Sequence, residues 1–320
     1  MSVLPGRRTS VALLLAVLAV FALLSPEFRR LETVTQILLQ ASSLVIVATG
    51  MTFVMITGGI DLSVGAVMFL GAALAGKLAL GLNAPLAVIV PVLLAVGLVW
   101  GSALGLLVTR WRLVPFVVTL AALFIGRGLG LAITRTRAMN LPESFHDLAT
   151  GSLFGVPIPI VLAALVVTLA QVVLHATPFG RQLFAAGEDA EKARKAGVAV
   201  RRVVAAAYVI CGFTAALGGL VSLCQLGAVS PSFGEGDEFL AIAAAVLGGT
   251  SLFGGRGSVI PGTLVGALIM QTLRVGLNVL NADPYSYPLI TAATIFIAVW
   301  IDSARERRLE RSASRRIRAD

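Results

Sequence analysis

Apolar residues along this chain gather into long runs that are separated by short polar stretches. A helix that crosses the roughly 30 Å hydrocarbon layer of a membrane needs about 20 consecutive, mostly apolar residues. Runs of this kind lie near 9–25, 36–57, 61–80, 85–108, 115–134, 157–175, 203–225, 238–254, 259–281 and 287–302. The pattern predicts an all-α polytopic membrane protein with about ten transmembrane helices.

Two of these runs have a second interpretation. The first follows Arg7 and Arg8, as in a cleavable signal peptide, but bulky residues at 21–24 occupy the expected cleavage region. We therefore expect a retained helix. The run at 238–254 contains LGGTSLFGG, and glycines at this density are typical of a broken or re-entrant helix as well as of a full span.

The cations in the loops indicate an orientation. Cytoplasmic loops of membrane proteins carry an excess of Lys and Arg. With the N-terminus in the cytoplasm, 18 cations lie in inside segments and five in outside segments. We expect both termini in the cytoplasm of a bacterial cell with the chain in its inner membrane. One transmembrane domain then covers 1–302, with a cytoplasmic loop at 176–202 and a basic tail at 303–320. The tail is expected to face anionic lipid rather than nucleic acid.

Composition agrees with a membrane protein and leaves little room for metal chemistry. Hydrophobic residues make up 58% of the chain and charged residues 13%, whereas a soluble domain is about half apolar and a quarter charged. Cys211 and Cys224 lie within apolar runs and are expected to be inert thiols. Since His146 and His175 are the only histidines, the sequence predicts no metal site.

The stretch FGRQLFAAGEDAEKARKAGV, residues 179–198, is unusually charged for this chain. Acidic and basic residues from Glu188 to Lys195 alternate three and four positions apart, which is the geometry of ion pairs on an exposed helix. Gly187 and Gly197 bracket a predicted helix of about ten residues. Such a helix suits docking into a groove of another protein, and a solvated linker is the equally open alternative.

Five stretches carry a resemblance to a known family. They are TGGIDLSVGA (57–66), VPFVVTLA (114–121), TPFGRQLFAAGEDAEKARKAGV (177–198), GEGDEFLAIAAAVLGGTSLFGGRGSVIPGTLVGALI (234–269) and GLNVLNADPY (276–285). Together they span nearly the whole chain, which resembles the permease subunit of bacterial ATP-binding-cassette importers of the ribose, xylose and galactose type, within the branched-chain amino acid and ribose permease family.

The resemblance implies a role for the charged loop, which is similar to the family's segment that couples the permease to its ATPase. This role falls on Phe179, Gly180, Arg181, Ala185, Gly187, Glu188, Asp189, Glu191, Ala193, Arg194 and Gly197. The sequence departs from the family pattern at Asp189, where Asn is frequent, and at Lys192, where a small residue is favoured. The chain itself has no GxxxxGK[ST] phosphate loop, so any ATP is expected to be used by a partner subunit.

Asp61 in TGGIDLSVG raises a separate question, because a carboxylate beside a membrane span is costly and often functional. Gly58 and Gly59 break the chain there, so Asp61 is expected to cap the next helix, with Ser63 in its first turn, or alternatively to touch substrate. The spacing GGxxLxxG recurs from Gly248 to Gly255. Both copies join an even-numbered run to the next odd one, which hints at an internal repeat.

Arg127 and Arg274 lie inside apolar runs and should face protein or a wet cavity rather than lipid. Guanidinium groups donate hydrogen bonds to sugar hydroxyls, but each arginine is equally suited to holding the carbonyl groups of a broken helix. Gln271, Thr272 and Asn278 are candidate neighbours of Arg274 in a translocation path. The alternative for them is hydrogen bonding between helices.

The segment 138–155, with Glu143, His146 and Asp147, is the longest predicted outer loop. Nearby arginines suit docking of an acidic soluble protein, and a plain solvated loop is the alternative. Acidic residues at 235–238 begin a predicted span, where the helix dipole favours them.

Three classes of function remain to be compared. The favoured one is a permease subunit, paired with a second copy or a sister subunit. It would pass a small sugar from a periplasmic or extracellular binding protein, driven by a separate ATPase. An amino-acid importer of related fold is an alternative, as is an ion-driven secondary transporter, although the charges in the middle of the runs are arginines rather than carboxylates. An intramembrane enzyme is disfavoured because the runs contain no GxSxG or HExxH motif, and no catalytic residue or bound cofactor is expected.

Overall fold

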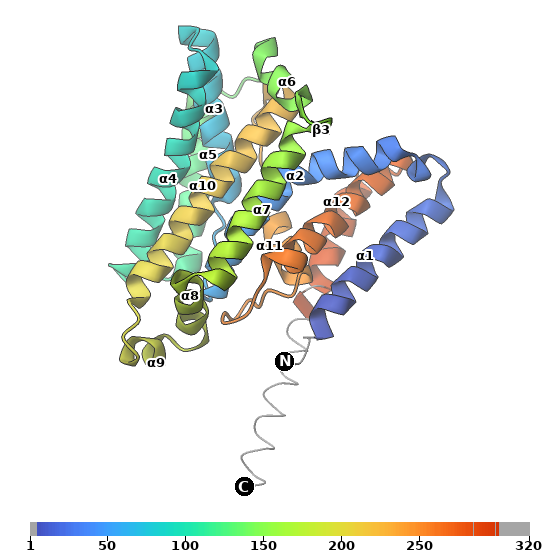
Figure 1. The fold of residues 1–320 in the computed structure, drawn as a ribbon. Helices are drawn as coiled ribbons and strands as arrows, with labels where there is room; N and C mark the ends of the chain where they lie inside the picture. The colour runs from blue at the N-terminus through green and yellow to red at the C-terminus, as the bar shows by residue number, and fades with distance from the viewer. Residues whose placement is uncertain (1–4, 284, 298, 301–320) are drawn as a thin grey trace.

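The computed structural model describes residues 5–283, 285–297, 299 and 300, and these residues are almost entirely helical (Figure 1). The helices are α1 (Pro5–Leu24), η1 (Glu27–Arg29), α2 (Leu31–Ile56), α3 (Val64–Leu82), α4 (Leu86–Thr109), α5 (Pro115–Thr134), α6 (Glu143–Thr150), α7 (Ile158–Ala176), α8 (Pro178–Glu188), α9 (Ala190–Lys195), α10 (Val200–Leu226), α11 (Asp237–Leu247), η2 (Val259–Thr263) and α12 (Leu264–Val279). A further helix covers Ser286–Ile297.

Among the described residues, seven helices are long and apolar enough to cross a membrane. They are α2, α3, α4, α5, α7, α10 and the segment Val259–Val279, which joins η2 and α12. Each of the ten predicted runs contains a helix, but α1 and Ser286–Ile297 have shorter apolar stretches. The chain is therefore a multi-pass helical membrane protein, while ten spans stay a prediction.

The run at 238–254 is not one continuous helix, in agreement with its interpretation as a broken or re-entrant helix. Helix α11 has 11 residues, which at 1.5 Å per residue reach about 16 Å. The chain then turns through the glycines of GGTSLFGG, of which Gly249, Gly254 and Gly255 have φ of 89°, 88° and 70°. These are left-handed conformations that an α-helix cannot include, so the helix ends there.

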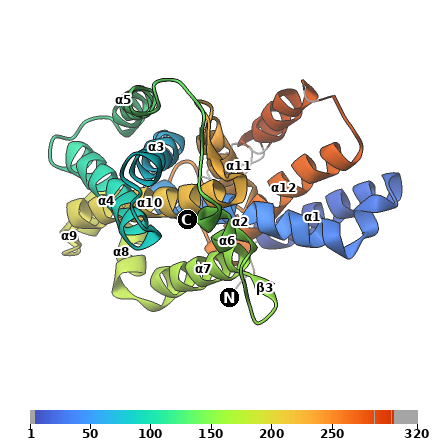
Figure 2. The ribbon, with the colours of Figure 1, turned by 90° about the horizontal axis from the view of Figure 1, so that it is seen from above.

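Small residues let the helices of the core approach closely. Gly97, Gly101 and Gly105 lie four residues apart on α4, and a Cβ at any of them would collide with the backbone of α10. Gly212 of α10 meets Gly97 and Gly101 in return. Seen from above, α10, α2 and α11 lie between α3, α4 and α5 on one side and α1 and α12 on the other (Figure 2).

The two ends of the bundle differ. At one end lie α8 and α9, together with the beginning of α1 (Figure 1). At the other end lie α6 and two short strand pairs: β1 (Met139–Asn140) with β4 (Ala228–Val229), and β2 (Ser152–Leu153) with β3 (Val156–Pro157). The charged loop and the predicted outer loop thus lie at opposite ends, as a membrane between them requires.

Candidate functional site: a coupling junction and a polar cavity

The charged loop forms two short helices rather than the single helix predicted between Gly187 and Gly197. Gly187 lies in the last turn of α8, and the chain breaks at Asp189, which has extended backbone angles. Asp189 then caps α9, because its Oδ1 accepts hydrogen bonds from the backbone N–H groups of Glu191 at 3.0 Å and Lys192 at 2.9 Å. Gly197, with φ of 86°, follows the end of α9 as predicted.

The outer face of α9 carries ion pairs of the predicted kind. Lys192 Nζ lies 3.2 Å from Asp189 Oδ2, and Lys195 Nζ lies 3.1 Å from Glu191 Oε1. The two departures from the family pattern, Asp189 and Lys192, are thus each other's partners. The backbone N–H of Lys192 holds the pKa of the Asp189 carboxyl below its usual value, and the Lys192 side chain lowers it further.

The inner face of α8 is packed against the membrane-spanning helices. Leu183 is fully buried and Ala186 nearly so, and Phe179 stacks on Phe53 of α2 with ring centroids 6.5 Å apart. A Cβ at Gly180 would collide with the carbonyl of Leu174 at the end of α7. The loop is therefore seated in the protein on one side and charged on the other.

Gly187 makes the closest contact between this loop and the spans. A Cβ there would collide with the carbonyl oxygen of Ile56, the last residue of α2, and with the backbone nitrogen of Gly255. These two groups are themselves joined, since the Gly255 N–H donates to the Ile56 carbonyl at 2.9 Å. We call the meeting point of residues 56–59, 187–188 and 253–255 the coupling junction.

The two GGxxLxxG segments meet in this junction. Gly254 contacts the backbone of Gly58 and the carbonyl of Gly187, and both Gly58 and Gly254 have positive φ. The recurrence seen in the sequence therefore has a spatial counterpart, while the internal repeat itself stays a prediction. Movement of α8 would reach α2 and α11–α12 through backbone contacts alone.

Asp61 holds the loop between α2 and α3. It is 1% exposed, and its Oδ1 accepts hydrogen bonds from the backbone N–H of Ser63 at 2.9 Å and from the Ser63 hydroxyl at 2.7 Å. Helix α3 begins at Val64, so Ser63 precedes the first turn instead of lying within it. Trp100 Nε1 also donates to Ser63 Oγ at 3.2 Å. Asp61 therefore does not cap α3 as predicted, because the N-cap residue is Ser63 and no side chain caps this helix. Its carboxylate closes the turn before the helix instead.

Arg127 holds the turns that lead into α11. Its Nη1 donates to the carbonyl of Phe233 at 2.9 Å, and its guanidinium lies over the ring of Phe69, 5.5 Å from the centroid. Arg127 thus has a structural contact, but with a loop carbonyl rather than with the end of a broken helix as predicted. Neither Arg127 nor Asp61 lines the cavity described next.

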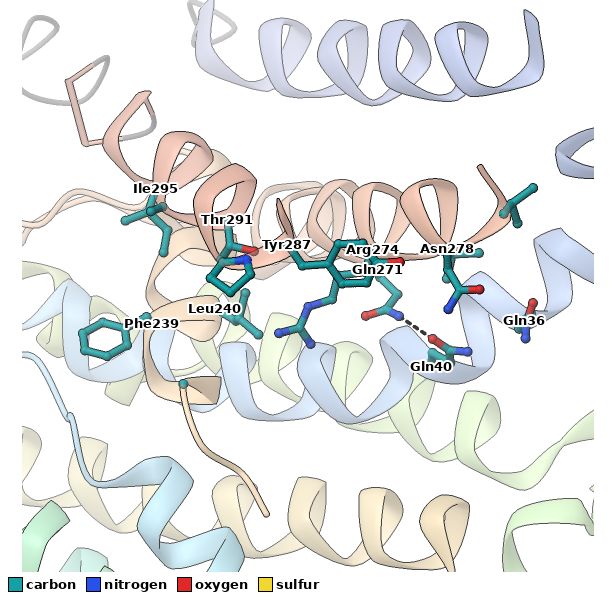
Figure 3. A pocket seen from close by; sticks show the side chains of 15 residues that line it. Gln36, Gln40, Phe239, Leu240, Gln271, Arg274, Asn278, Tyr287, Thr291 and Ile295 are labelled. Carbon is teal, nitrogen blue, oxygen red and sulfur yellow. Dashed lines mark hydrogen bonds between the residues drawn. The ribbon is translucent and has the colours of Figure 1, made fainter. Parts of the chain in front are cut away.

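A cavity of about 690 Å³ lies between α2, the start of α11, α12 and the helix Ser286–Ile297 (Figure 3). Gln271, Arg274 and Asn278 line it from one face of α12, as their spacing predicted. Gln36 and Gln40, one turn apart, line it from α2. Gln271 Nε2 donates to Gln40 Oε1 at 2.7 Å across the two helices. We call this space the large cavity.

A second space of about 60 Å³, the small pocket, adjoins the large cavity. Both are lined by Gln40, Gln271 and Arg274. Beyond these three residues, the small pocket reaches Ser43, Ser222 and Asp237. Thr272 lines neither space and is 1% exposed.

Comparisons with known proteins identify the family. A family model described as "Branched-chain amino acid transport system / permease component" matches residues 33–299. The chain belongs to this permease family. The ribose import permease protein of Haemophilus influenzae is 34% identical over 302 residues, with 93% of each chain covered. The D-allose transport system permease protein of Escherichia coli K12 is 34% identical, covering 91% of this chain and 89% of its own. No solved structure matches.

A third relative is the fructose import permease protein of Rhizobium meliloti, 35% identical over 307 residues, which cover 93% of this chain and 85% of the relative. The permease is thus a transport component related along nearly its full length to import permeases whose names specify sugars.

Sequence reasoning missed part of the polar lining of this permease. Gln36 and Gln40 are one turn apart, and they are the two amide side chains of α2, which is the signal that would have found them. Asp237 was assigned only to the helix dipole of α11, yet it lines the small pocket. Tyr287 and Thr291, four residues apart in the helix Ser286–Ile297, also line the large cavity and were not singled out.

The predicted outer docking loop includes α6, whose Phe145 and Ala149 are buried while Glu143, His146 and Asp147 are exposed. The three polar residues thus lie on the accessible face of a short helix. Docking of a soluble binding protein there stays a prediction.

Proposed function

We propose that this chain is the translocation subunit of an ATP-driven importer that passes a small sugar across the bacterial inner membrane. The observation that carries the proposal is the match to ribose, allose and fructose import permeases over about nine tenths of the chain. The large cavity supports it, because side-chain amides and a guanidinium both suit neutral hydroxyl groups.

The proposal requires partners. A separate ATPase subunit would dock on the charged face of α8 and α9 and use the ATP. A second permease copy or a sister permease would complete the path, and a binding protein would deliver the sugar at the opposite end. The N- and C-termini would then lie in the cytoplasm with α8 and α9.

The coupling junction explains how such a partner could drive transport. Force on α8 reaches α2 and the α11–α12 loop through Gly187 and through the hydrogen bond from Gly255 to Ile56. Packed backbone has no rotamer freedom to absorb a displacement, so the movement is passed on as a rigid-body shift.

An amino-acid substrate is the second candidate, because the family description names branched-chain amino acid transport. Asp237 and Arg274 both line the small pocket and would offer opposite charges to a zwitterion. An ion-driven secondary transporter has less support, since the membrane-embedded charge that lines the large cavity is Arg274.

Uptake by host cells tests the proposal. Cells that carry the chain on a plasmid, in a background lacking the native copy, should accumulate radiolabelled ribose, allose or fructose, and vanadate or ATP depletion should stop it. Accumulation of leucine with no uptake of any sugar would favour the second candidate instead. Uptake that persists without ATP and collapses with the proton gradient would contradict the ATP-driven mechanism.

A further inference from the structure

The hydrogen bond between Gln40 and Gln271 stands where the large cavity meets the small pocket. Both amides line both spaces, and Arg274 is the only other residue that does so among those described. In Figure 3 the two glutamines point toward each other from α2 and α12, with the guanidinium of Arg274 beside them. The contact therefore spans the boundary between a wide space and a narrow one.

The sizes of the two spaces make this boundary a constriction. The large cavity, at about 690 Å³, is in the range of small-molecule sites. The small pocket, at about 60 Å³, has room for about two water molecules at the volume of liquid water. A sugar fits the first and can enter the second only if α2 and α12 separate, which breaks the amide pair.

We propose that Gln40 and Gln271, with Arg274 beside them, form the point at which the permease recognises sugar hydroxyls during translocation. This inference rests on the proposed function. A hydroxyl group both donates and accepts, so it replaces either amide as the partner of the other. The sugar thereby compensates the hydrogen bond lost when the helices separate, whereas an apolar solute does not.

The surroundings fit a polyhydroxylated ring. Arg274 donates to ring or hydroxyl oxygens, and Asp237, Ser43 and Ser222 offer further partners in the small pocket. Phe239 and Tyr287 provide apolar ring surface for the C–H face of the sugar on the large-cavity side.

The competing explanation is that the amide pair only holds α2 to α12. The two explanations differ for a double substitution. Gln271 is 5% exposed, so removing Gln40 alone leaves a buried amide without its partner, whereas replacing both amides by apolar groups of similar shape is nearly neutral. A purely structural pair should therefore recover function in Gln40→Met/Gln271→Met, and a recognition point should not.

The test measures ATP-dependent uptake of radiolabelled ribose, allose and fructose by host cells expressing the wild-type or variant chain with its native partners. The wild type must first import one of these sugars; if it imports none, the proposed function fails before this inference is reached. The double variant is then expected to import at a tenth of the wild-type rate or less, since a lost hydrogen-bond partner changes rates by about tenfold or more. A higher rate at equal membrane abundance overturns the recognition role.

Gln225→Met serves as the matched control. Gln225 Nε2 donates to the carbonyl of Leu39 at 2.7 Å, so this amide also joins another helix to α2, but it lines neither space. Its substitution removes an amide contact to α2 outside both spaces, and uptake within twofold of wild type at equal membrane abundance is expected.

A single cysteine decides the matter if the double variant is not recovered in the membrane. Gln40→Cys keeps Gln271 and Arg274 and is labelled in membranes with a methanethiosulfonate reagent, while the native Cys211 and Cys224 are buried. The imported sugar should slow the labelling, because it occupies the same place. An unchanged labelling rate in the presence of the sugar would overturn the proposal.

Discussion

The coupling junction is made of backbone contacts, whereas the large cavity is lined by side chains. At the junction, glycine backbone from α8 meets the end of α2 and the loop after α11, with no side chain between them. In the cavity, long amide and guanidinium side chains reach across open space. Backbone packed on backbone moves as one body, whereas side chains in a cavity can change partners. The junction is therefore suited to transmit a displacement, and the side chains of the cavity are suited to change hydrogen-bond partners when the helices move.

The largest expected effect comes from putting a methyl group into the junction. Gly187→Ala places a Cβ against the Ile56 carbonyl and the Gly255 nitrogen, so α8 must shift or unseat. The free energy of unfolding should fall by about 1–3 kcal/mol, as for other overpacked sites. ATP-driven uptake should fall further than protein abundance does, measured as uptake per permease in membranes.

Gly128→Ala is the control for this substitution. Gly128 lies within α5, and a Cβ there meets nothing within 4 Å. Helix propensity favours alanine by about 0.5–1 kcal/mol at such a site. Unchanged uptake in Gly187→Ala would show that the junction is not the route of coupling.

The contacts of Arg127 are predicted to hold the segment before α11 in place, and a substitution of Arg127 tests this. Arg127→Met removes the donor to the Phe233 carbonyl and the contact with Phe69. A hydrogen bond from a charged donor contributes about 1.5–3 kcal/mol, so the melting temperature in detergent should drop clearly. Arg137→Met, at an exposed loop position, should leave it unchanged. Equal melting temperatures for both variants would mean that the segment before α11 is held by other contacts.

The charged face of α9 should affect transport more than stability. Glu191→Lys breaks an exposed ion pair with Lys195, which contributes about 0.2–0.5 kcal/mol. Abundance should be unchanged, while uptake falls because an acidic residue on the face presented to the ATPase has become basic. The swap Glu191→Lys/Lys195→Glu restores the pair within the helix. Recovery of uptake in the swap would indicate that only the internal pair matters, and continued loss would locate the effect at the partner.

The smallest effect concerns pH. The folded-state pKa of Asp189 lies below its unfolded value of 3.8, so its capping contribution is fully present above that value. As pH falls below about 4 and through the folded pKa, the carboxyl protonates and the contribution is lost. Hydrogen exchange at the Glu191 and Lys192 amides should accelerate, relative to intrinsic rates, in that window. Asp189→Asn keeps the cap and should show no such transition.

The sequence predicted the apolar runs well because each run is a local property. It did not predict the break at Asp189, since charges three and four apart are also compatible with one longer helix. The polar capping side chain before Glu191 was the available signal. The structure shows that the two glycine segments meet, which the sequence spacing could only suggest.

The sequence also predicted the part of the polar cavity lining that lies on a single helix, α12. Gln271, Arg274 and Asn278 share a face by their spacing along one helix. Their partners on α2 could not be assigned, because which helix faces α12 depends on tertiary packing. The local contacts of Asp61 were equally hidden, since a buried turn and a substrate ligand carry the same sequence signal.

The ATP-driven mechanism is tested by purifying the tagged chain from its native membrane in mild detergent. A cytoplasmic protein with phosphate-loop motifs should copurify and hydrolyse ATP. Its association with the permease, but not the abundance of the permease, should be lost in Glu191→Lys. A chain that purifies alone and drives uptake on an ion gradient in vesicles would contradict this mechanism.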